Sequence, residues 1–195
     1  MKLLINNLFI ILISFSCVEK KKLKPNEYIS YMNSNENSFT RERKFNNIKY
    51  KLKIQPAEIL ALHENDLSAE KIQKSINYYK DKLNFILIIE DDGSYKVRST
   101  VFEKEKYGTV LSYANTDLKK DFTLINGKDS VYCSLLHLES ANSIQPVIRM
   151  TIGFTGIQKL ESDLTLIYND NIFSNGPLKF YYSKEALNDL PQLNF

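Results

Sequence analysis

The clearest pattern in the chain is a strict alternation of apolar and basic positions between residues 48 and 54. Four apolar side chains take every second position and lysines stand between them: Ile48, Tyr50, Leu52 and Ile54 alternate with Lys49, Lys51 and Lys53. A period of two is typical of a strand with one buried face. Asn46 and Asn47 precede this strand, and Asn tolerates the positive φ angles of a two-residue turn. We therefore predict a hairpin over residues 39–54.

This turn also sets the expected register of the hairpin. It places Phe45 opposite Ile48 and Phe39 opposite Ile54, and the lysines then line one face of the sheet together with Glu42. We interpret this face as solvated, with lysines that discourage pairing of exposed strand edges. Contact with a membrane surface is the alternative.

Further strands are indicated by short apolar runs. Residues 85–89 read FILII, an uninterrupted apolar run that predicts a strand covered on both faces. Asp92-Gly93 is a strong turn signal, so residues 95–102 are expected to return as the second strand of a hairpin. The remaining predicted strands span residues 107–113, 122–125, 131–139, 147–154, 164–168 and 178–182.

A few segments have helical spacing instead. Residues 25–35 begin with Pro25, which suits a first helical turn, and residues 56–64 also have a helical pattern. After Ser68, a possible N-cap, an apolar stripe recurs every three or four positions at Ala69, Ile72, Ile76, Tyr79 and Leu83. Ser183 is expected to cap a last helical turn over residues 184–188.

The order of these elements predicts an α+β fold. Strands cluster as hairpins and do not alternate one by one with helices, which argues against a doubly wound fold. We expect a mostly antiparallel β-sandwich, or a strongly curved sheet, with a few short covering helices.

The N-terminus has a different pattern. Residues 8–13 are wholly apolar and the stretch ends by Phe15, short of the roughly 18 residues that a membrane-spanning helix needs. With Lys2 before it, the segment is typical of a secretory signal peptide over residues 1–16. An uncleaved anchor helix is the alternative.

Residues 14–17 read Ser-Phe-Ser-Cys, and this stretch resembles the lipobox of bacterial lipoproteins in the relaxed form found in Bacteroidota. The resemblance covers only the N-terminal segment; Ser14 replaces the usual Leu and Phe15 is bulky. It implies cleavage between Ser16 and Cys17, and a diacylglyceryl group on the Cys17 thiol, so that the mature chain carries fatty acyl chains such as palmitate.

An ordinary secretory cleavage site fits the same bond, because Ser14 and Ser16 are both small. Cys17 would then keep a free thiol that could pair with Cys133 in an oxidising compartment. If Cys17 is acylated, Cys133 has no intramolecular partner.

The resemblance implies an address and a division of the chain. It implies a signal peptide over residues 1–16 and a lipid-anchored tether over 17–24, and the length of the remaining chain predicts a single globular domain over 25–195. The tether is basic, and it either contacts anionic lipids or is simply solvated. In Bacteroidota lipoproteins an acidic cluster after the Cys resembles a surface-export tag. Because no such cluster follows Cys17, the resemblance implies the periplasmic face of the outer membrane in the cell envelope.

Composition adds little about chemistry. The 195 residues are 43% hydrophobic and 25% charged with a net charge of +3, which is ordinary for a globular protein. Lysine far outnumbers arginine, as an AT-rich genome would encode, so the mild positive charge is explained by codon usage. A site that binds phosphates is expected to be rich in arginine, and we therefore expect no nucleic-acid partner. With two His and two Cys, we predict no catalytic residues, no cofactor and no metal site.

The individual candidates for chemistry have plainer interpretations. Cys133 and His137 are four residues apart on a predicted strand, about 13 Å and too far to form a dyad, so Cys133 is expected to be a small buried thiol. Glu90 and Asp91 belong to an acidic run interpreted as a solvated turn, and His63 as a helix-end residue.

These observations predict a non-enzymatic, lipid-anchored protein of the cell envelope that contacts the membrane through its anchor and binds a protein, glycan or lipid. Two alternatives stay open. One is an exported hydrolase that uses carboxylates such as Glu58, Glu90 or Asp91. The other is a structural subunit of an envelope complex.

Overall fold

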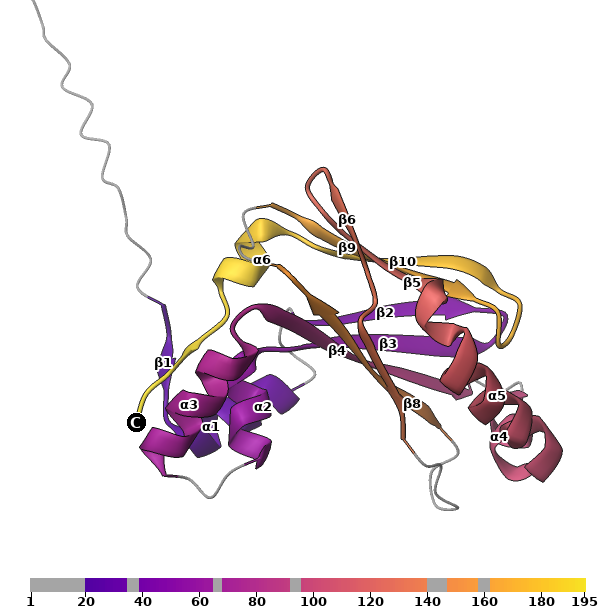
Figure 1. The fold of residues 1–195 in the computed structure, drawn as a ribbon, viewed down its shortest axis with the longest axis horizontal. Coiled ribbons are helices and arrows are strands. Elements are labelled where there is room, and N and C mark those ends of the chain that lie inside the picture. The colour runs from indigo at the N-terminus through magenta and orange to yellow at the C-terminus, as the bar shows by residue number, and fades with distance from the viewer. Residues whose placement is uncertain (1–19, 35–38, 65–67, 92–95, 140–146, 158–161) are drawn as a thin grey trace, which may run out of the picture.

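Two antiparallel sheets face each other across a shared core, and helices gather near both ends of the larger sheet (Figure 1). The computed structural model describes residues 20–34, 39–64, 68–91, 96–139, 147–157 and 162–195. Ser16, Cys17 and the predicted signal peptide lie outside these residues. The predicted α+β class, mostly antiparallel and strand-rich, is confirmed.

The larger sheet has five strands in the spatial order β2-β3-β4-β8-β7, all antiparallel to their neighbours. Its strands are β2 (Thr40–Phe45), β3 (Ile48–Gln55), β4 (Lys82–Asp91), β8 (Ile148–Thr155) and β7 (Leu135–Leu138).

The smaller sheet has the order β10-β9-β5-β6 and is also antiparallel. Its strands are β10 (Gly176–Tyr182), β9 (Leu164–Asp170), β5 (Phe122–Asn126) and β6 (Asp129–Tyr132). A third, two-stranded parallel sheet joins the two ends of the described chain: β1 (Lys22–Leu23) and β11 (Gln192–Leu193).

The helices lie in the connections between strands. They are α1 (Pro25–Asn33), α2 (Ala57–Glu64), α3 (Ala69–Tyr79), α4 (Lys96–Phe102), α5 (Lys104–Thr116), the 3-10 helix η1 (Leu118–Asp121) and α6 (Lys184–Asn188). Figure 1 shows α1, α2 and α3 below one end of the larger sheet and α4 and α5 near its other end. Among the described residues, no helix combines the length and apolar character needed to cross a membrane.

The predicted β2–β3 hairpin is confirmed in register as well as in position. Phe45 pairs with Ile48, and Asn46 and Asn47 adopt the positive φ angles, 47° and 62°, of the expected turn. The backbone N–H of Ile54 donates to the carbonyl of Phe39 at 3.2 Å, so the pairing extends to the predicted limit of the hairpin.

The helices predicted over residues 25–35, 56–64, after Ser68 and over 184–188 form as α1, α2, α3 and α6. Ser183 caps α6, because its hydroxyl accepts from the backbone N–H of Ala186 at 3.2 Å. Ser68 stands at the N-cap of α3, but its side chain makes no capping hydrogen bond. Leu83, which the stripe placed on that helix, lies instead in β4.

The strands predicted over residues 95–102 and 107–113 are wrong, because residues 96–102 belong to the helix α4 and residues 107–113 to the helix α5. Tyr95 and the predicted turn at Asp92-Gly93 lie outside the described residues. The carboxylate of Asp91 accepts hydrogen bonds from the backbone N–H groups of Val97, at 3.0 Å, and Arg98, at 2.7 Å, and so satisfies donors that the first helical turn leaves free. Val97 and Val101 are both buried and four residues apart, which is helical spacing.

The single strand predicted over residues 131–139 is two strands in two different sheets. The chain passes from the smaller to the larger sheet between β6 and β7. The backbone N–H of Cys133 donates to Phe122 of β5 at 3.4 Å, and that of Ser134 donates to Gly153 of β8 at 2.8 Å. Consecutive residues thus bond to opposite layers of the fold.

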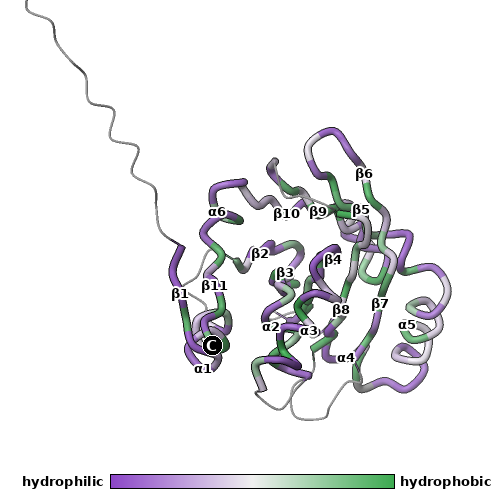
Figure 2. Tube along the Cα trace, turned by 60° about the vertical axis from the view of Figure 1, so that its left-hand side comes forward, coloured by the Kyte–Doolittle hydropathy of each residue, from purple (hydrophilic) through white to green (hydrophobic). Residues whose placement is uncertain are grey.

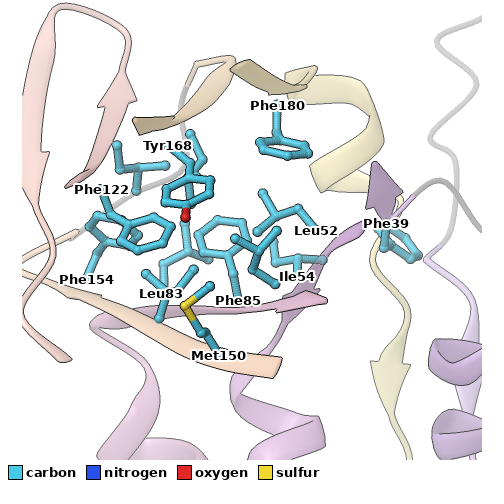
Figure 3. Packing of buried hydrophobic residues seen from close by; sticks show 14 of the residues in the cluster. Phe39, Leu52, Ile54, Leu83, Phe85, Phe122, Met150, Phe154, Tyr168 and Phe180 are labelled. Atoms are coloured by element: carbon cyan, nitrogen blue, oxygen red, sulfur yellow. The ribbon is translucent and has the colours of Figure 1, made fainter. Parts of the chain in front are cut away.

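The core lies between the two sheets, as Figure 3 shows for the labelled side chains of β3, β4, β5, β8, β9 and β10. The rings of Phe122 and Tyr168 stack at 4.6 Å within the smaller sheet, and Phe85 lies 5.9 Å from Tyr182 across the two sheets. Hydrophobic stretches alternate with hydrophilic ones along the strands in Figure 2.

The apolar run of β4 is covered unequally on its two faces. Phe85, Leu87 and Ile89 are fully buried against the smaller sheet, whereas Ile86 and Ile88, on the opposite face, are only half-buried. The expectation of a strand covered on both faces is therefore only half met. The incompletely covered outer face is where the candidate site lies.

Candidate functional site

A groove of about 380 Å³ lies on the outer face of the larger sheet. Its apolar floor is formed by Ile86 and Ile88 of β4, and three cationic side chains flank that floor: Lys51 and Lys53 of β3 and Arg149 of β8. We call this surface the basic groove. A volume of this size falls at the lower end of the range for small-molecule sites.

Strand register brings these five residues together. Lys51 pairs with Ile88, and Ile88 pairs with Arg149 on its other side, so the three form one row across the sheet. Lys53 pairs with Ile86 in the next row. Residues paired directly across strands point to the same face. The floor is therefore apolar along β4 and cationic along both neighbouring strands.

The walls come from the helices near this end of the sheet and from the strand edge. Asn33, the last residue of α1, and His63, in the last turn of α2, both line the groove. Thr40 of β2 and Gln55 at the end of β3 complete the lining. His63 is exposed at a helix end, as predicted, but sequence reasoning did not place it beside the lysines.

The cations of the groove are unequally neutralised. Lys51 forms an ion pair with Glu90 at 2.7 Å, and Arg149 lies 3.4 Å from Glu139. Lys53 donates a hydrogen bond of 2.8 Å to the side-chain oxygen of Asn33, and within the described part of the chain it meets no carboxylate. Lys53 therefore carries the least compensated charge of the three.

The pKa directions agree with this inequality. A hydrogen bond from Lys51 to Glu90 raises the pKa of Lys51, which favours its charged form. Burial, and secondarily the positive charge of Arg149, lowers the pKa of Lys53. An anion placed between Lys53 and Arg149 would oppose both effects, because a nearby negative charge favours the charged form of Lys53.

The carboxylates proposed for a hydrolase are not brought together as a reactive pair. Glu90 accepts from Lys49 and Lys51 on the outer face of β4, and Asp91 caps α4. Glu58 lies in the first turn of α2. The interpretation of Glu90 and Asp91 as a solvated turn is wrong, because both are half-buried at the end of β4. Glu90 forms ion pairs with lysines, and Asp91 accepts backbone hydrogen bonds from α4.

The Cys133 and His137 positions do not form a dyad. Cys133 lies between β6 and β7, is only half-buried, and its thiol donates to the carbonyl of Leu135 at 3.0 Å. Burial raises the pKa of this thiol, which disfavours the thiolate. The expected small buried thiol is thus corrected to a half-buried one. Among the described residues, no group of three or more His, Cys, Asp or Glu side chains could hold a metal ion.

A second polar cluster lies inside the fold, around Asp170 and Asp121. Asp170 is 1% exposed and accepts from the hydroxyls of Tyr50 and Tyr168, at 2.5 and 3.0 Å, and from a backbone N–H. Asp121 is 6% exposed and accepts from Tyr113 and from Asn171, each at 2.8 Å. Because protein donors occupy their oxygens, we assign these two carboxylates a structural role as hydrogen-bond acceptors inside the fold. Sequence reasoning did not single them out.

Comparison of the chain with protein-family models, with curated proteins and with solved structures finds no match. The candidate site rests on the geometry of the basic groove alone.

Proposed function

We propose that this chain is a lipid-anchored protein of the cell envelope, held at the periplasmic face of the outer membrane, with a folded body that binds a ligand without transforming it. The Ser-Phe-Ser-Cys motif at residues 14–17, after a short apolar segment, carries the anchoring part of this proposal. The basic groove supports the binding part.

The position of β1 gives the anchor a structural consequence. The backbone N–H of Gln192 donates to the carbonyl of Lys21 at 2.8 Å, so the chain is already part of the fold at that point. The four Cα–Cα steps from Cys17 to Lys21 extend over at most about 14 Å. A lipid on Cys17 would hold the body close to the bilayer.

The basic residues after Cys17 divide between tether and fold. The Lys21 ammonium lies 4.5 Å from the ring centre of Tyr31 on α1, and Lys22 lies in β1. Both are exposed. Positive charge at the entry to the fold would favour an anionic lipid surface by about 1 kcal/mol per residue before screening.

A binding role fits the groove better than catalysis. The groove offers cations and an apolar floor, and Glu90, the carboxylate nearest to it in register, is shared between two lysines. The hydrolase alternative would need a free carboxylate pair, and the buried pair at Asp170 and Asp121 accepts protein hydrogen bonds instead.

The test is fractionation of the host cell that expresses the complete chain. The wild type is expected in the membrane fraction, with an intact mass that exceeds the chain from residue 17 onwards by a diacylglyceryl group or more. Cys17→Ala is expected to release the body into the soluble fraction. Cys133→Ala is the matched control and should stay with the membrane. An unmodified mature mass, or a Cys17→Ala chain that remains in the membrane, would refute the anchor.

A further inference from the structure

We infer that the basic groove binds a small ligand in which an oxyanion, a carboxylate or a phosphate, adjoins a short apolar part. This inference rests on the proposed binding role and adds the ligand's chemical class. It depends on Lys53, Arg149 and the two isoleucines between them.

The two cations lie on strands separated by β4 alone. Neighbouring strands are about 4.8 Å apart, so the backbones of β3 and β8 are about 10 Å apart across the floor. The long side chains of Lys53 and Arg149, extended toward β4 over the outer face of the sheet, could both contact one oxyanion between them. The guanidinium of Arg149 offers the planar set of donors that suits carboxylate and phosphate oxygens.

The charge balance favours an anion at this place over a cation. Glu90 pairs with Lys51 at 2.7 Å and also with Lys49, and Glu139 lies at the longer distance of 3.4 Å from Arg149. Lys53 donates to a neutral amide, and its pKa is lowered because its charge is buried near another positive charge. A bound oxyanion would supply the counter-charge that the described chain does not.

The floor determines the rest of the ligand. Ile86 and Ile88 project from successive outward positions of β4 and are only half-buried, although the sheet face around them is polar. An alkyl or similarly apolar segment laid along them would remove their exposed surface from water. An oxyanion alone would leave this surface wet, so we expect the apolar part to add affinity.

The shape of the site favours a small ligand. The groove holds about 380 Å³ and is bounded by Asn33 of α1 and His63 of α2 at one side. A ligand with a six-carbon chain and one anionic group is of suitable size for sites of this class.

The test is calorimetric titration of the complete chain carrying Cys17→Ser, which removes the lipid and changes no described residue. Four probes separate the contributions: inorganic phosphate, hexyl phosphate, hexanoate and hexylamine. We expect saturable binding of hexyl phosphate or hexanoate, weaker binding of inorganic phosphate, and none of hexylamine. The stronger of the two hexyl anions identifies the oxyanion as phosphate or carboxylate.

Substitutions then locate the binding. Lys53→Gln and Arg149→Gln are each expected to weaken hexyl anion binding about tenfold or more, the usual loss for a hydrogen bond to a charged group. Lys179→Gln is the matched control, because Lys179 is an exposed strand lysine on β10 outside the groove, and it should change affinity less than twofold. The melting temperature of each variant shows that it is folded.

Equal affinity of the groove variants and the control, equal binding of hexylamine, or no saturable binding of either hexyl anion would overturn the inference. These outcomes are independent of fractionation. If the titrations fail while Cys17→Ala still releases the body, the ligand class is wrong and the anchor stands.

Discussion

The hydroxyl of Tyr50 donates a 2.5 Å hydrogen bond to the carboxylate of Asp170, and this bond joins β3 of the larger sheet to β9 of the smaller one inside the core. Tyr168 donates to the same carboxylate from within the smaller sheet, at 3.0 Å. Asn175 donates in turn to the Tyr50 oxygen at 2.6 Å. One buried acidic side chain therefore organises polar groups from both layers.

Removing this acceptor should destabilise the fold strongly. Asp170→Ala leaves the Tyr50 and Tyr168 hydroxyls and the Phe173 N–H without their acceptor, and buried unsatisfied donors cost about 1–3 kcal/mol each. We expect the free energy of unfolding in urea to fall by about 3 kcal/mol or more. Asp129→Ala, at an exposed position of β6, should change it by less than about 0.5 kcal/mol. Similar losses in both variants would contradict a structural role for Asp170.

At Asp121, in contrast, the negative charge of the buried carboxylate is expected to lower the free energy of unfolding. Burial raises the pKa of this carboxyl above its ordinary value of 3.8, so the folded chain binds the proton more tightly than the unfolded chain. The ionised group then lowers stability above the folded pKa, and this cost is lost as pH falls below the unfolded value.

Asp121→Asn removes the charge and keeps an oxygen that can accept from Asn171. We expect the variant to equal or exceed the wild type at pH 7, by up to about 1 kcal/mol, and the difference to shrink at acidic pH. The measurement is urea unfolding at a series of pH values. Asp163→Asn should change stability in the other direction at pH 7, because hydrogen bonds from Tyr181 and Lys184 lower the pKa of Asp163. A loss of stability in Asp121→Asn that does not vary with pH would refute the charge argument.

Two glycines test close packing with the same substitution. A Cβ atom on Gly153 would lie 2.8 Å from the Asn84 side-chain oxygen and 3.0 Å from the Leu135 Cβ, whereas one on Gly108 in α5 would meet nothing within 4 Å. We expect Gly153→Ala to lower the melting temperature at a cost of about 1–3 kcal/mol. Gly108→Ala should raise the melting temperature, because alanine favours helix over glycine by about 1 kcal/mol of folding free energy. An unchanged or raised melting temperature of Gly153→Ala would show that the β7–β8 approach does not require glycine.

The sequence predicted best where local chemistry decides structure. The alternation from Ile48 to Ile54 and the pair Asn46-Asn47 determine the β2–β3 hairpin and its register without help from distant residues. Ser183 likewise identifies the start of α6.

The predictions failed where a distant contact or a change of layer decides structure. Asp92-Gly93 favours a hairpin, but the capping carboxylate of Asp91 and the four-residue spacing of Val97 and Val101 support α4. The pattern of residues 131–139 stays strand-like through Cys133, so nothing local marks the passage between sheets.

The basic groove was only partly predictable. The lysines of β3 were identified as one face, and that face was interpreted as solvated. Arg149, His63 and Asn33 come from three other elements, and only the order β3-β4-β8 and the position of α1 and α2 place them beside Lys53. Sequence periodicity gives the direction of a side chain but not the neighbour it meets.

The pairing of β1 with β11 has a consequence for how the protein is made. Lys22 lies beside Gln192, so two segments from almost opposite ends of the chain must meet, and closing so long a loop is slow and entropically costly. A ribosome produces Lys22 long before Gln192. Strand β1 therefore stays unpaired until β11 has been synthesised. Proteolytic removal of β11 would leave β1 unpaired again.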